Sequence, residues 1–144
     1  MKLYKTDEKE KQAMKIRVLS RDNLAEALDL SSVIEGVEAV YQAKAQGKAV
    51  AWPLVEYKFE NGGIMDIRSG GVFDDVGIHG AKLLNNFPKN AEENLPVFTG
   101  ILMAFDSRTG LPIGVMDASY ITSLRTGAAA AIGAATLAKA DSET

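Results

Sequence analysis

The stretch that decides the fold is Met116–Ala135, which reads MDASYITSLRTGAAAAIGAA. It predicts the end of a strand, a polar turn, and then a helix that runs to about Lys139 and carries one cation, Arg125, among very small residues. Each of Gly127 and Gly133 costs a helix about 1 kcal/mol relative to alanine. A helix that accepts both is expected to pack very close to another backbone, with Arg125 beside that contact instead of freely solvated.

Composition excludes several classes of function. The chain has 144 residues, a one-domain length, and its net charge of −3 gives no reason to expect a nucleic-acid or membrane-surface partner. The absence of cysteine rules out disulfides and thiol catalysis, and it fits the cytoplasmic location that we expect. With His79 as the one histidine, neither a zinc cluster nor a Ser-His-Asp triad is expected, so no metal is predicted. No apolar stretch is long enough to predict a signal peptide or a membrane span.

Two helices are expected near the start of the chain, after a polar extension at residues 1–15. A short strand at residues 16–19 precedes Ser20, which can cap a brief helix that ends near Leu28. Ser32 and Glu35 have the spacing of a capping box, which predicts a longer helix that ends near Gly47. The buried face of this helix is expected at helical spacing, on Val33, Val37, Val40 and Tyr41.

From Ala49 the apolar period changes to two, which predicts strands. Asn61-Gly62-Gly63 has the residues that tolerate positive φ in a hairpin turn. The expected strands are 55–59 paired with 64–68, then 78–84, and after a polar loop at 85–94 the hairpin of 97–105 and 111–116. The predicted fold class is α+β, a mostly antiparallel sheet flanked by a capped N-terminal helix and a Gly/Ala-rich C-terminal helix.

Few motifs carry chemistry by themselves. The segment from Gly77 to Lys82 lacks the spacing and ending of a phosphate loop, and the chain contains no G-x-G-x-x-G. His79 is expected just before its strand, at the edge, without a catalytic role. The aspartates are expected in turns or at strand ends, and no pair is spaced for acid–base work: Asp66, Asp74, Asp75 and Asp106. No catalytic residue is therefore assigned.

Three cations are the candidate site residues. Lys82 lies in an apolar strand, and taken alone it predicts a lysine directed to water. Arg68, taken alone, predicts a charge at a strand terminus. Arg125 lies in a small, apolar helix, where a guanidinium needs a carboxylate partner. Two partners remain open, Asp117 within the chain or the carboxylate of a substrate, and the residues by themselves indicate a soluble domain with an anion site.

Several motifs resemble one family in order and spacing. They are NLPV at 94–97, LMAFD at 102–106 with Thr109-Gly110 after it, and MDASYITSLRTGA at 116–128. Gly80-Ala-Lys82 and the E-x-V-x-x-x-Y pattern of the first long helix fit as well. Over about residues 16–139 the chain resembles the ornithine cyclodeaminase and mu-crystallin family, which includes cyclodeaminases (lyases), amino acid dehydrogenases and imine reductases.

The resemblance implies an activity and a set of site residues. Family members are homodimers whose N-terminal domain binds an amino, keto or imino acid and forms the dimer through its sheet. A Rossmann domain that follows binds NAD(H) or NADP(H), which takes a hydride from the amino acid to give an imine. The residues matching Lys82 and Arg125 bind the substrate carboxylate, a base near Arg68 joins them, and Arg125 also lies close to the cofactor.

The chain departs from the family pattern in two ways that affect function. It ends at Thr144, where the family enters its Rossmann domain, so residues 16–144 are expected to be a substrate-binding and dimerisation domain that neither binds cofactor tightly nor turns over substrate alone. Pro53-Leu54 stands where the family usually has Pro-Arg or Pro-Lys, which puts ornithine in question as the substrate. The alternative is a non-catalytic dimerising module that binds an amino or keto acid.

Overall fold

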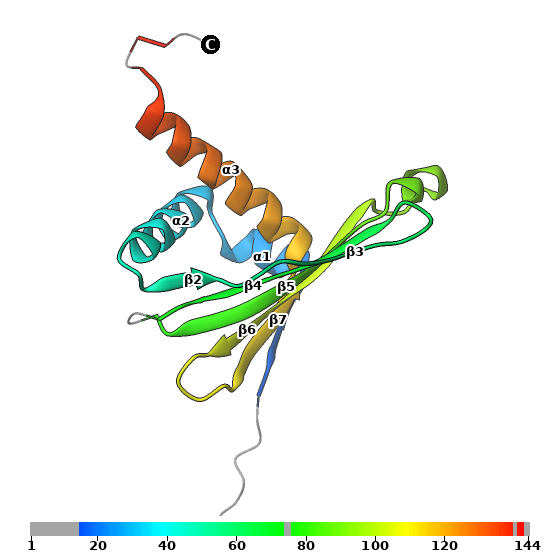
Figure 1. Ribbon diagram of the computed structural model, residues 1–144, viewed down its shortest axis with the longest axis horizontal. Helices are drawn as coiled ribbons and strands as arrows, with labels where there is room; N and C mark the ends of the chain where they lie inside the picture. Colours follow the sequence, from blue (N-terminus) through cyan, green and yellow to red (C-terminus); the bar gives the residue numbers. More distant parts are fainter. Residues whose placement is uncertain (1–14, 74–75, 140, 143–144) are drawn as a thin grey trace, which may run out of the picture.

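A computed structural model describes residues 15–73, 76–139 and 141–142, and in these residues helices lie over one face of a seven-stranded sheet (Figure 1). The expected polar extension, apart from Lys15, falls outside the described residues, as do Asp74 and Asp75. The elements are β1 (Arg17–Leu19), α1 (Arg21–Ala27), α2 (Leu30–Ala45), β2 (Ala49–Ala51), β3 (Val55–Lys58), β4 (Ile64–Val72), β5 (Ile78–Asn86), a 3-10 helix (Pro88–Glu93), β6 (Phe98–Asp106), β7 (Pro112–Asp117) and α3 (Ala118–Leu137). The predicted α+β class is confirmed.

The sheet is mostly antiparallel, as predicted, in the order β1-β7-β6-β5-β4-β2, with β3 also paired to β4. Both predicted hairpins form. In the first, the Phe59 N–H donates to the Gly63 carbonyl at 2.8 Å, and Gly62 takes a φ of +86° in the turn. Among the described strands, β1 alone pairs in parallel, along β7. From this parallel edge the chain runs through α1 and α2 to β2, the last strand in this order.

The helix starts follow side-chain caps, one of which the sequence predicted correctly. Ser20 caps α1 and exchanges hydrogen bonds with Asn23. The capping box predicted for Ser32 and Glu35 is wrong, because Asp29 caps α2: its carboxylate accepts the Ser32 N–H at 2.9 Å, one turn earlier. At the other end Gly47 has a φ of +74°, as its predicted position after the helix requires.

The close backbone contact predicted at the two glycines of α3 is not found within the described residues. The N-terminal half of α3 lies over β5 and β6, and its C-terminal half extends away from the sheet (Figure 1). A Cβ added at Gly127 or Gly133 would meet nothing within 4 Å. Neither glycine is therefore required by a neighbouring backbone within the described residues.

The two faces of the sheet differ. Toward the helices, Leu84 and Ala118 are buried where α3 meets β5 and β6, and Ala43 is buried on α2. Among the described residues, no helix lies on the opposite face (Figure 1). We call it the open face, and it leaves large apolar side chains exposed, including Val18, Val55, Tyr57, Ile101 and Met103.

Candidate functional site

The pairing of β4 with β5 sets Arg68 directly opposite Lys82. The prediction that Arg68 ends its strand is wrong, because β4 continues to Val72. Directly opposed residues share one face of a sheet, so both side chains start from the helix-bearing face. The Lys82 amino group donates to the Thr122 hydroxyl of α3 at 2.9 Å, instead of pointing to open water.

Lys82 is the most perturbed group of the site. Burial lowers the pKa of Lys82 from 10.5 to about 8, repulsion by Arg125 and Arg68 adds to the shift, and Asp66 opposes it. In the part of the chain that the structure describes, Lys82 forms no ion pair with a carboxylate. A bound anion would therefore remove a repulsion that this fold maintains.

Arg68 already has a carboxylate beside it. Its Nη2 lies 3.0 Å from Oδ2 of Asp66, and its Nε donates to Oδ1 at 3.2 Å. This pair raises the pKa of Arg68. Asp66 is the third residue of β4, whereas the prediction placed it in a turn or at a strand end. Since the Arg68 side chain is 53% exposed, it can still turn toward a ligand.

Arg125 lies on α3 facing α2, and it is exposed, contrary to the prediction. It lines a cavity of about 400 Å³ between these helices together with Val37 and Tyr41. The predicted alternative partner, Asp117, instead caps α3 by accepting the Tyr120 N–H at 2.8 Å. Within the described residues Arg125 forms no ion pair, yet its charge acts on Lys82.

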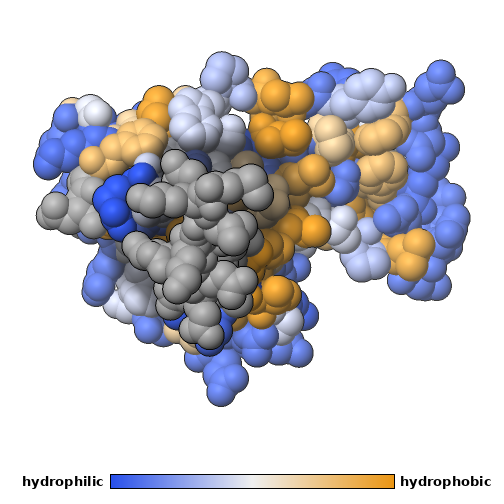
Figure 2. All heavy atoms as spheres, turned by 90° about the horizontal axis from the view of Figure 1, so that it is seen from below, coloured by the Kyte–Doolittle hydropathy of each residue, from blue (hydrophilic) through white to orange (hydrophobic). Residues whose placement is uncertain are grey.

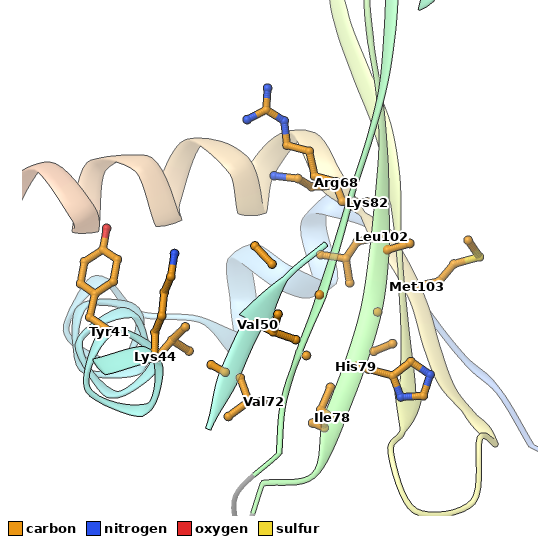
Figure 3. Close-up of a pocket in the computed structure, with 18 residues that line it drawn as sticks. Tyr41, Lys44, Val50, Arg68, Val72, Ile78, His79, Lys82, Leu102 and Met103 are labelled. Atoms are coloured by element: carbon orange, nitrogen blue, oxygen red, sulfur yellow. The ribbon is translucent and has the colours of Figure 1, made fainter. Parts of the chain in front are cut away.

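A second cavity, of about 420 Å³, lies between α2 and the sheet, and we call it the α2 cavity. Figure 3 shows Arg68 and Lys82 at one end of it and Val72 and Ile78 at the other. Lys44 of α2 also lines it and directs its amino group toward α3 (Figure 3). Sequence reasoning missed Lys44; its spacing of four from Val40, on the predicted inner face of the helix, was the available signal.

His79 takes no part in the cation cluster. It lies inside β5 and not before it as predicted, and its ring points away from α2 (Figure 3). The ring stacks on Phe105 at a centroid distance of 5.4 Å, and Nδ1 lies 3.2 Å from the Ser107 hydroxyl. These contacts show that His79 packs against an aromatic neighbour. Asp106, at the end of β6, accepts the Thr109 N–H in the predicted turn.

No group of three or more potential metal ligands occurs among the residues that the structure describes. In the same residues, no helix is long and apolar enough to cross a membrane.

The pairing of β4 with β5 brings Arg68 and Lys82 together on an α+β domain, and comparison with known proteins identifies the family. The family model for the ornithine cyclodeaminase/mu-crystallin family matches residues 14–144. The chain therefore belongs to this family, as the motifs indicated.

Individual relatives agree with this assignment. The alanine dehydrogenase of Archaeoglobus fulgidus is 34% identical over 90% of this chain and 39% of the relative. Among solved structures, an archaeal alanine dehydrogenase dimer with bound NAD superposes with a TM-score of 0.83 at 32% identity, over 89% of this chain and 39% of that one. The Δ1-pyrroline-2-carboxylate reductase of Thermococcus litoralis, in complex with NADH and L-proline, also gives 0.83, at 28% identity over 89% and 40%. This chain thus spans about 40% of the length of such relatives.

Proposed function

We propose that residues 16–144 form the substrate half of an NAD-dependent enzyme that acts on an amino or imino acid, and that Lys82, Arg125 and Arg68 bind the substrate carboxylate. The main support for the proposal is the set of contacts and charges around Lys82. It is held by Thr122, repelled by two arginines, and has no carboxylate partner among the described residues. A ligand carboxylate fits this position because it supplies the missing negative charge.

The relatives support the choice of ligand. The two solved structures above hold NAD and NADH, and one also holds L-proline, an amino acid with a carboxylate. A carboxylate held by Lys82 and Arg125 would be fixed in position and orientation, which can contribute several kcal/mol to a reaction by proximity alone. The cations would bind and orient, and no residue of this chain is assigned as acid or base.

The cofactor would be NAD(H) or NADP(H), which supplies hydride transfer when it is bound. The described residues contain no glycine-rich turn between a strand and a helix that could hold a pyrophosphate. The chain's own contact with a cofactor is therefore confined in this proposal to Arg125, which is exposed on α3. Tight cofactor binding would need a separate dinucleotide-binding domain.

We assign the open face as a homodimer interface. Figure 2 shows apolar side chains gathered in a band on the side of the molecule away from the helices. Ile101 is 53% exposed and Val18 76% exposed there. Contiguous apolar surface of this kind marks an interaction site, and the archaeal alanine dehydrogenase relative is a dimer.

Isothermal titration of the chain with pyruvate and L-alanine tests the carboxylate site. We expect Lys82→Met and Arg125→Gln each to weaken binding at least tenfold, because each removes a charge-assisted hydrogen bond. Lys89→Met, in the exposed 3-10 helix, is the matched control and should bind like the wild type. Equal affinity in Lys82→Met and wild type would refute the assignment. NAD reduction by this chain alone would refute the division of labour with a separate cofactor domain.

A further inference from the structure

The floor of the α2 cavity is a row of very small residues across the sheet. Ala51, Gly70, Gly80 and Ala104 stand directly opposite one another on four strands. Two of them cannot be larger, because a Cβ at Gly70 would collide with the Val50 carbonyl oxygen and one at Gly80 with that of Met103. The row leaves the sheet surface low beneath α2, which creates the hollow.

The cavity has a charged end and an apolar end, because the row of small residues lies to one side of the cations. Gly80 lies two residues along β5 from Lys82, which is about 7 Å, and Ile78 lies four residues along, about 13 Å. Arg68 and Lys82 are thus at one end of the cavity, and Val72 and Ile78 are at the other (Figure 3). The floor between them consists of the glycines and alanines of this row. The fourth cation, Lys44, points its amino group back toward α3, at the charged end.

The chemistry of the wall selects the ligand that could enter. Apart from Tyr41, His79 and the cations, the described lining is glycine, alanine, aliphatic side chains and one methionine, and no carboxylate is among those described residues. An ammonium group at the end of a ligand side chain would be desolvated there without a partner, which is unfavourable. An apolar side chain would instead be removed from water. A volume of about 420 Å³ lies within the range of small-molecule pockets.

We propose that the α2 cavity receives the side chain of the substrate, and that the substrate is an amino or 2-oxo acid with a branched or aromatic apolar side chain. This inference rests on the proposed function, because Lys82 and its neighbours must hold the carboxylate at the charged end. Diamino acids such as ornithine are disfavoured by the same wall.

Calorimetric titration of the whole chain with three 2-oxo acids tests the inference: pyruvate, 4-methyl-2-oxopentanoate and 2-oxoglutarate. We expect the branched acid to bind at least about tenfold more tightly than pyruvate, as extra methylene groups in an apolar pocket allow. It should also bind more tightly than 2-oxoglutarate, whose second carboxylate would lie against the apolar floor.

Two variants locate the effect. Ala51→Leu fills the floor from an exposed edge strand and should remove the preference, so that the branched acid no longer binds more tightly than pyruvate. Ala45→Leu, on α2 but outside the cavity lining, is the control and should keep the preference. Equal affinities of the three acids, all lost in Lys82→Met, would overturn the side-chain inference and leave the carboxylate site standing. Binding that is absent, or that survives Lys82→Met, would overturn both.

Discussion

Replacing Lys82 by methionine should stabilise the fold while it removes carboxylate binding. Methionine has nearly the length of the lysine stem, so packing between β5 and α3 is retained. The charge that Arg125 and Arg68 repel is removed. Improved stability with lost binding is the expected signature of a residue kept for its ligand and not for the fold.

The magnitude follows from the pKa of Lys82. A fall from 10.5 to about 8 corresponds to about 3.4 kcal/mol at 1.36 kcal/mol per pKa unit. Because the side chain is only half-buried, solvent screens much of this penalty. The variant also loses the hydrogen bond to Thr122, worth about 1 kcal/mol. We expect a net gain of about 1 kcal/mol at pH 7.

Urea unfolding of wild type and Lys82→Met at one protein concentration measures this difference. The folded pKa of Lys82 lies below the unfolded value, so the unfolded chain binds more protons between pH 8 and 10.5. The penalty is therefore complete below about pH 8 and disappears as the pH rises toward 10.5. The advantage of the variant should shrink over that window, and Lys89→Met should show no such trend. A variant less stable than wild type at pH 7 would refute the reasoning.

Three further outcomes are expected. Carboxylate affinity should fall about tenfold between pH 7 and pH 9 as Lys82 loses its proton, and titration calorimetry at constant ionic strength measures it; a pH-independent affinity would exclude Lys82 from the site. Asp29→Ala should lower the urea midpoint of unfolding, whereas Glu35→Ala should not. Hydrogen bonds from Ser32 hold the pKa of Asp29 below its ordinary value of 3.8, so the stabilisation by this cap should be lost as the pH falls through that lowered pKa. Ile101→Lys on the open face should convert a dimer to a monomer in sedimentation equilibrium, and an unchanged mass would contradict the interface assignment.

Local chemistry explains which parts of the fold could be predicted. Both hairpins formed where the sequence placed them, because a turn such as Asn61-Gly62-Gly63 determines the pairing of its flanking strands. The start of α2 was misplaced because two overlapping caps compete: Asp29 and Ser32 are both good N-cap residues, and Glu35 suits only the later one. Sequence spacing does not rank two such caps.

The site was less predictable because it depends on register and on spacing between elements. The three cations were identified from the sequence, but the register that sets Arg68 opposite Lys82 was not, and β4 runs four residues beyond its expected end. Glycines at 70 and 71 made that extension look like a loop. Lys44 was missed because its spacing from Val40 indicates only the inner face of α2, and not how far that helix stands from the sheet.

The arrangement of charge explains why the cluster suits a ligand better than an internal ion pair. Asp66 is the carboxylate beside the cluster among the described residues, and it lies against Arg68, whose side chain is 53% exposed. Lys82, the most desolvated, keeps a hydroxyl partner that cannot neutralise it. An ion pair between Asp66 and Lys82 would stabilise the fold more, because an unpaired charge costs most where it is least solvated. The charge left uncompensated at Lys82 is therefore where a substrate carboxylate would gain most on binding.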